Sequence, residues 1–211
     1  MKKVTIIDYG VGNLLSLKMA LEFLGAQVLI TREKNLILHS SHIILPGVGA
    51  YSNAMNLIKK YNIDEYLIAS KNKGTNILGI CLGMQLLMTS SKEFGFTNGL
   101  NFIQGKVIPI TDLINYKKNI KIPNIGWHKI ILQNPDRNNL ILNNISQKDS
   151  FYFVHSFISQ ATDVSCLKYY SKYSNLEIPA IISKENIIGC QFHPEKSGNS
   201  GLNLLSNFIS L

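Results

Sequence analysis

The sequence predicts an α/β protein with a mostly parallel central sheet flanked by helices, and with a further β portion in its C-terminal half. Three observations support this fold class. Short β-branched runs alternate with helical patterns through the first 100 or so residues, and strands separated by helices favour parallel pairing. Strand-like segments dominate after about residue 100. No linker or repeat divides the 211 residues, so we expect a single domain over 1–211.

The first elements predict a βαβ unit. Residues 4–7 form a β-branched run, and leucines then recur at helical spacing from residue 14 to 24 until Gly25 ends the pattern. A second strand is expected at 28–31. The chain therefore opens with two parallel strands joined by a helix.

The next segments continue the alternation. A buried strand is expected at 42–45, helical material from about 53 to 73, and another strand at 76–80. A helical run follows at 84–89. In the C-terminal half we expect strands at 106–110, 151–157, 180–183 and 187–192, and a closing helix at 202–209.

Composition excludes several classes of protein. The 21 basic and 13 acidic residues give a net charge of +8, but only two basic residues are Arg, the side chain that best recognises phosphate; we expect no nucleic-acid partner. The longest apolar run, 77–88, is interrupted by Gln85 and is shorter than the roughly 20 residues of a membrane span. The N-terminal apolar run is too short for a signal peptide, which predicts a cytoplasmic protein.

The cysteines also argue against an exported protein. There are three, Cys81, Cys166 and Cys190, an odd number without CxxC spacing. We expect reduced thiols rather than a disulfide framework.

Gly79, Cys81 and Gly83 form a G-x-C-x-G pattern between a predicted strand and a predicted helix. This is the arrangement of a nucleophile elbow, in which a tight turn projects the side chain clear of the sheet and the glycines leave room for a strained backbone and a substrate. A helix N-terminus also favours the thiolate. The alternative is a buried structural cysteine.

His193 is the best candidate for the base. Pro194 forces an extended conformation at His193, and in an extended chain Glu195 lies on the same face, where it can fix the histidine tautomer. Cys190 falls on the opposite face, which argues against a Cys190–His193 pair and against a zinc site; we expect no metal or other cofactor. Taken alone, His193 fits a surface loop equally well.

Amide hydrolysis by such a set also needs donors for the oxyanion. In α/β-hydrolases the acid precedes the histidine, whereas here it follows by two residues, which disfavours an esterase of that fold. The N–H of Leu82 is one candidate donor. The segment Pro46-Gly-Val48-Gly49 supplies others, because glycine-flanked peptides can be aimed at a charge and can also flip. A simple strand-ending turn is the alternative.

Together, four motifs resemble class I, or triad-type, glutamine amidotransferases: GICLGMQL at 79–86, FHPEKSG at 192–198, PGVG at 46–49 and DYGVGN at 8–13. The similarity is greatest to glutaminase subunits of imidazole glycerol phosphate synthases and spans essentially the whole chain. It implies the class I glutamine amidotransferase fold, in which the C-terminal β portion is antiparallel or mixed.

The resemblance also implies roles for particular residues. Cys81 becomes the nucleophile, His193 the acid and base, and Glu195 the group that orients His193. Val48, Gly49 and Leu82 are implied as the donors to the oxyanion. Glutamine contacts are implied for Gly49, Gln85, His155 and Ser156, and contacts with a synthase partner for Asn13, Trp127 and Lys196. Without the resemblance, the single tryptophan would favour a packing role.

The implied reaction is hydrolysis of L-glutamine to glutamate and ammonia through a thioester. Since the glutaminase occupies the whole chain, the ammonia acceptor must lie on a partner: a barrel-type cyclase that makes imidazole glycerol phosphate and AICAR in histidine biosynthesis, in a heterodimer with this chain. His128 stands where the family commonly has Asn after Trp127. This departure leaves open a related glutaminase that supplies an N-acetyl sugar amidotransferase.

Two hypotheses of other classes remain: a cysteine peptidase of related fold, and a non-catalytic binding subunit. Turnover of peptides without any need for glutamine would favour the first. The presence of all three triad residues disfavours the second.

Overall fold

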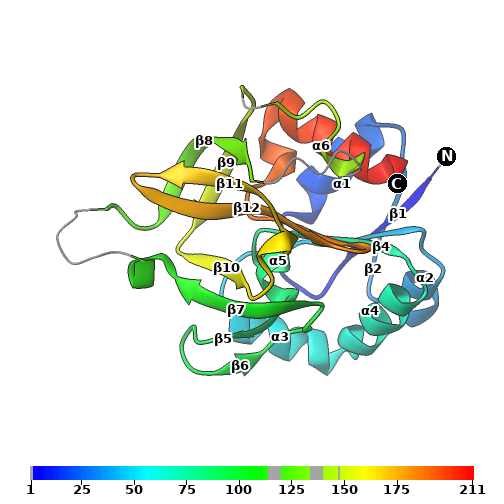
Figure 1. Cartoon of the computed structure of the whole chain (residues 1–211). Coiled ribbons are helices and arrows are strands. Elements are labelled where there is room, and N and C mark those ends of the chain that lie inside the picture. Colours follow the sequence, from blue (N-terminus) through cyan, green and yellow to red (C-terminus); the bar gives the residue numbers. More distant parts are fainter. Residues whose placement is uncertain (1, 114–119, 134–139, 147) are drawn as a thin grey trace.

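A nine-stranded sheet forms the centre of the molecule in the computed structural model, which describes residues 2–113, 120–133, 140–146 and 148–211. Its strand order is β2-β1-β3-β4-β13-β12-β11-β8-β9. One half is parallel and the other antiparallel (Figure 1). The predicted α/β fold with a parallel sheet and an additional antiparallel portion is confirmed.

The parallel half comes mainly from the first 80 residues. Its central strands are apolar and buried along nearly their whole length, as expected for strands covered on both faces. Its members are β1 (Lys3–Ile7), β2 (Gln27–Thr31), β3 (His42–Leu45), β4 (Asn76–Ile80) and β13 (Ile187–Cys190).

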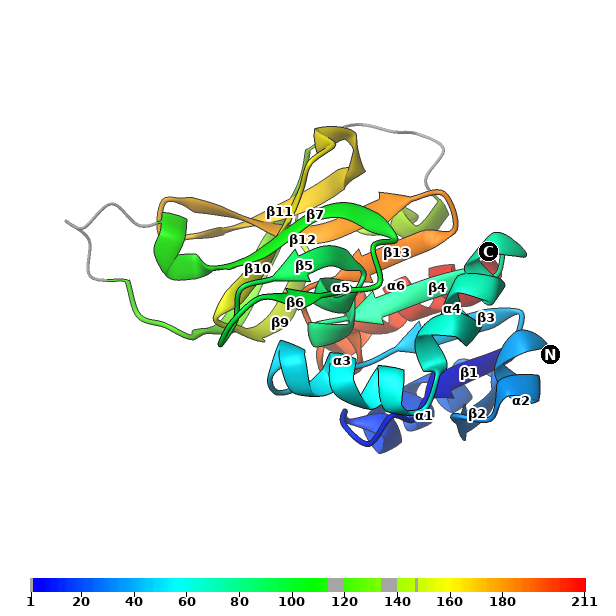
Figure 2. The same cartoon turned by 90° about the horizontal axis from the view of Figure 1, so that it is seen from below.

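The antiparallel half extends this sheet, and a separate mixed sheet of order β10-β7-β5-β6 packs beside it (Figure 2). The antiparallel strands are β8 (Asn124–Leu132), β9 (Ser150–His155), β11 (Leu167–Tyr173) and β12 (Leu176–Lys184). The second sheet contains β5 (Met88–Ser91), β6 (Thr97–Asn98), β7 (Ile103–Pro109) and β10 (Phe157–Ala161).

Helices cover both faces of the large sheet. One apolar core joins it to α1 (Leu14–Phe23) and α6 (Gly198–Ser210). The other core joins it to the second sheet and to α2 (Lys34–Leu38), α3 (Tyr51–Lys60), α4 (Ile63–Asn72) and α5 (Leu82–Leu86). Short 3₁₀ turns lie at Ile110–Leu113, Leu140–Leu142, Val164–Cys166 and Pro194–Lys196.

The structure corrects the predicted helices. The helical material at 53–73 is two helices, because Asn62 has a left-handed conformation (φ 54°) between them. The helix predicted at 84–89 ends at Leu86, and Met88 instead begins β5, which pairs with β6 and β7.

The predicted strand at 151–157 is also two elements. β9 ends at His155, and after Ser156 the chain enters the second sheet as β10. The junction of the two sheets therefore lies at two of the residues expected to contact glutamine.

Candidate active site

The site lies where three neighbouring parallel strands end. β3 leads into Pro46–Gly49, β4 into Cys81, and β13 into the segment that carries His193. These strands are adjacent in the sheet, in the order β3-β4-β13. Since parallel strands end at one edge, the topology brings the predicted oxyanion loop, nucleophile and base together, at the position where open α/β sheets commonly bind ligands.

Cys81 has the backbone expected of a nucleophile elbow. Its φ of 55° and ψ of −110° lie in a region that side chains rarely adopt. The backbone N–H of Cys81 donates to the Cys190 carbonyl at 2.8 Å, which holds the strained residue against β13. The residue is 7% exposed and lines a cavity. Its strand-to-helix position is confirmed.

The flanking glycines act differently from the prediction. A Cβ on Gly83 would lie 1.8 Å from the Leu45 carbonyl oxygen, and a Cβ on Gly79 would lie 2.6 Å from that of Gly83. Both glycines therefore face protein rather than substrate. They allow α5 to pack closely on β3 and β4, which fixes the position of Cys81.

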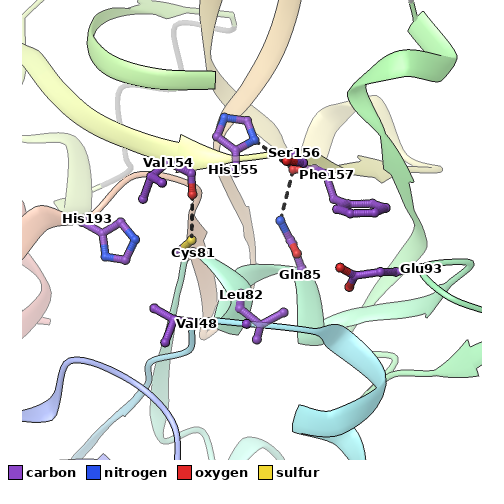
Figure 3. Close-up of a pocket in the computed structure, with 11 residues that line it drawn as sticks. Val48, Cys81, Leu82, Gln85, Glu93, Val154, His155, Ser156, Phe157 and His193 are labelled. Atoms are coloured by element: carbon purple, nitrogen blue, oxygen red, sulfur yellow. Dashed lines mark hydrogen bonds between the residues drawn. The ribbon is translucent and has the colours of Figure 1, made fainter. Parts of the chain in front are cut away.

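His193 is held between Glu195 and Cys81. Its Nδ1 lies 2.8 Å from Glu195 Oε1, and both side chains are 3% exposed. The other nitrogen, Nε2, points towards Cys81 (Figure 3) and has no hydrogen-bond partner of regular geometry among the described residues. Burial lowers the pKa of His193, but the neighbouring Cys81 and Glu195 outweigh burial and raise this pKa to about 10. The arrangement thus favours an imidazolium beside the sulfur.

Backbone contacts fix the histidine segment from behind. The His193 N–H donates to the Tyr152 carbonyl at 2.9 Å. The Ser197 hydroxyl donates to the His193 carbonyl at 2.6 Å and accepts from the Tyr152 N–H at 3.0 Å. The position of the candidate base therefore depends on β9 as well as on β13.

The predicted oxyanion residues surround the sulfur. Val48, Gly49 and Leu82 all line the cavity that contains Cys81. Within the described part of the chain, no acceptor takes a hydrogen bond from their three backbone N–H groups. Gly49 has a φ of 96°, a conformation that suits glycine. These N–H groups are therefore unpaired in the described structure.

Tyr9 anchors the start of the oxyanion loop. Its hydroxyl donates to the Pro46 carbonyl at 2.7 Å, and the side chain is completely buried. Burial raises the pKa of Tyr9, so the hydroxyl stays protonated and remains a donor. The predictions from sequence did not include this contact.

The cavity encloses about 280 Å³ and is lined at one end by Cys81 and His193 and at the other by Gln85 and Glu93. Figure 3 shows Gln85 and Glu93 on the side of the cavity away from His193. Glu93 was not predicted as a site residue. Its Oε2 accepts from the Tyr51 N–H at 2.8 Å, which places a carboxylate in the cavity wall.

His155 and Ser156 also line the cavity, but the His155 ring is fully engaged in the protein. Its Nδ1 donates to the Phe157 carbonyl at 2.9 Å, so Nε2 of the neutral ring accepts from Asn124 Nδ2 at 3.0 Å. Burial lowers the pKa of His155 to about 4, which keeps the ring neutral. The ring therefore has no nitrogen left for glutamine. The backbone carbonyls of Val154 and Phe157, on either side of this pair, contact Cys81 and Gln85.

None of the three residues expected at a partner interface is buried. Asn13 lines a small cavity with His193 and Glu195, and Lys196 is exposed. Trp127 is 56% exposed and packs edge-on against Tyr152. A packing role in the core, which a lone tryptophan favours, is wrong. We call Asn13, Trp127 and Lys196, the residues predicted to contact a partner, the partner face.

The described residues contain no cluster of three or more His, Cys, Asp or Glu side chains suited to a metal. No helix in the described part of the chain is long and apolar enough to cross a membrane.

Cys166 and Cys190 are free and buried, and burial raises the pKa of both thiols.

Comparison with known proteins defines the class. The family model for class-I glutamine amidotransferases matches residues 5–211. Two solved structures show the same fold at 18% identity: PurLQS from Thermotoga maritima (TM-score 0.72, covering 99% of this chain and 97% of that one) and a GMP synthase subunit from Thermoplasma acidophilum (TM-score 0.71, 100% and 93%). This chain belongs to the class-I glutamine amidotransferases.

Curated relatives are more specific. The imidazole glycerol phosphate synthase subunit HisH of Lactococcus lactis is 43% identical over 209 residues, which cover 99% of this chain and 98% of the relative. The protein of the same name from Geobacillus sp. is 38% identical over 208 residues, covering 99% and 96%.

Proposed function

We propose that this chain is the glutaminase subunit of an imidazole glycerol phosphate synthase, active in the cytoplasm in histidine biosynthesis. The observation that carries the proposal is the meeting of Cys81 with the His193–Glu195 pair at one small cavity, in a chain of this family. The name and full-length similarity of the curated relatives support the pathway.

In the proposed mechanism, the Cys81 thiolate attacks the side-chain carbonyl carbon of glutamine. The N–H groups of Val48 or Gly49 and of Leu82 stabilise the charge that develops on the carbonyl oxygen. His193, protonated beside Cys81, donates its proton to the leaving nitrogen, so ammonia departs and a thioester remains. The neutral His193 then takes a proton from water, which attacks the thioester and releases glutamate.

The other end of the cavity suits the α-amino and α-carboxylate groups of an amino acid. The Glu93 carboxylate is placed to pair with the substrate ammonium, and Gln85 adds a polar contact. The volume is smaller than that of most drug-sized pockets, which favours a small metabolite over a peptide. Free glutamine is therefore a better substrate than a peptide for this cavity.

The partner in this proposal is a barrel-type cyclase that contacts the partner face and receives the ammonia. Ammonia that escapes into neutral water is mostly protonated and no longer nucleophilic. A second protein docked beside the triad would receive it before that happens. The cyclase would use it to form imidazole glycerol phosphate and AICAR.

The test is reconstitution with the cyclase and its phosphoribosyl substrate. We expect the complex with the natural chain to form product from glutamine. The complex with Cys81→Ala should form product only when ammonium chloride is supplied. No glutamine-dependent product in either complex would overturn the proposal. Stimulation of an N-acetyl sugar amidotransferase, and not of the cyclase, would assign the chain to the sugar pathway.

A further inference from the structure

Gln191 is a buried amide beside the reacting sulfur that has no role in the mechanism above. Its side chain is 0% exposed and does not line the substrate cavity. It lies two residues before His193, just after β13, where its backbone N–H donates to the Ala180 carbonyl at 2.9 Å. Its side-chain Nε2 lies 3.8 Å from Cys81 Sγ, within hydrogen-bonding range for sulfur.

A chain of contacts fixes which end of this amide faces the sulfur. The Phe157 carbonyl can only accept, and Gln85 Nε2 donates to it at 3.1 Å. The same nitrogen lies 3.1 Å from Gln191 Oε1. Flipping the Gln191 amide would place two donors opposite each other. Gln191 must therefore present its oxygen to Gln85 and its N–H to Cys81.

The other neighbour of the sulfur makes this donor important. The Val154 carbonyl lies 3.9 Å from Sγ, where it can accept from the thiol but only repels the thiolate. A buried N–H offsets that repulsion, and hydrogen bonds to charged groups are stronger than neutral ones.

We propose that the Gln191 side-chain amide stabilises the Cys81 thiolate by donating to Sγ, in an orientation that Gln85 and Phe157 impose. Gln85 lines the substrate cavity and Phe157 begins β10, so the second sheet and the substrate contact both help to set the state of the nucleophile. The inference rests on the proposed nucleophilic role of Cys81.

The test measures the alkylation rate of Cys81 by iodoacetamide from pH 5 to 10, with the label located by peptide mass spectrometry. Gln191→Met keeps the size of the side chain but removes the donor, and we expect the midpoint of the pH profile to rise by about one pH unit. Gln191→Asn is too short to span Gln85 and Cys81, and its midpoint should also rise. If only one of the two variants folds, the midpoint of its alkylation profile is sufficient to test the proposal.

Asn186→Ala is the matched control. Asn186 precedes β13 at its other end, and its amide bridges the carbonyls of Lys71 and Thr75, far from the sulfur along the strand. We expect a lower melting temperature with an unchanged midpoint. A folded Gln191 variant with the natural midpoint would overturn the inference. Alkylation needs neither glutamine nor the partner, so that result would leave the proposed glutaminase intact.

Discussion

The three cysteines differ in ways that their local sequences only partly reveal. Cys81 combines a strained backbone with access to a cavity. Cys190 is close in sequence to the catalytic segment, yet it is completely buried and its Sγ contacts the Phe192 carbonyl. Which thiol can react therefore depends on where it lies relative to the end of its strand, and not on how close it is to His193 in the sequence.

This contrast predicts selective labelling. A diazoketone analogue of glutamine should label Cys81 and spare Cys166 and Cys190, because burial raises the pKa of the latter two thiols. Cys190→Ser should retain most of the glutaminase activity, whereas Cys81→Ala should have none. Peptide mapping checks the prediction, and a label on Cys190 would show that the nucleophile is wrongly assigned.

His155 predicts a pH dependence of stability. Its pKa is lowered to about 4 in the folded protein, against about 6.5 when unfolded. As the pH falls, His155 is therefore protonated in the unfolded state before it is protonated in the folded state. The contribution of neutral His155 to the free energy of unfolding is fully present above about pH 6.5 and is lost towards pH 4. Between pH 7 and pH 5 the loss should be about 2 kcal/mol.

Urea unfolding at these two pH values checks this. His155→Gln does not titrate, so its stability should fall by about 2 kcal/mol less than that of the natural chain over the same interval. An equal fall in both proteins would mean that His155 does not carry the effect.

At the scale of elements, the parallel strands and the triad could be predicted from sequence because their signals are local. The strands at 42–45 and 76–80 are confirmed at their predicted bounds. The break at Asn62 was missed because the helical pattern continues through it. β5 was missed because its conformation depends on pairing with β7, a contact that short apolar runs do not reveal.

The same distinction applies to the site. Glu93 reaches the cavity only because β5 enters the second sheet, so no local motif indicates that it is a site residue. Gln191 did leave a signal, since it has the same alternation as His193 and Glu195. Its contacts with Gln85 and Cys81 depend on tertiary structure and could not be predicted.

The loop that follows β3 supplies a prediction about an element. Tyr9→Phe removes the donor to the Pro46 carbonyl and should destabilise the protein by about 1–3 kcal/mol. The turnover number for glutamine should fall more than its KM changes, because the loop carries the proposed oxyanion donors.

Tyr51→Phe is the matched control. Tyr51 is also completely buried, but its hydroxyl has no hydrogen-bond partner among the described residues. Its removal should leave stability unchanged or slightly increased. If chemical denaturation gave equal losses for both variants, the Tyr9 hydroxyl would not anchor the loop.

At the scale of the whole molecule, two residues connect the substrate cavity with a small cavity that Asn13 lines. Val48 and His193 each line both cavities. A partner docked at Asn13 would therefore press close to the oxyanion loop. We predict that the Gly47-Val48-Gly49 peptide adopts its productive orientation only when that partner is bound. The required coupling is about 1 to 3 kcal/mol, which is typical of allosteric proteins.

The most direct test is the steady-state rate of glutamine hydrolysis by this chain, with and without the cyclase and its phosphoribosyl ligand. We expect the isolated chain to be slow and the rate to rise at least about tenfold in the complex, which corresponds to roughly 1.4 kcal/mol of barrier. An isolated chain as active as the complex would contradict the account of a glutaminase that its partner switches on.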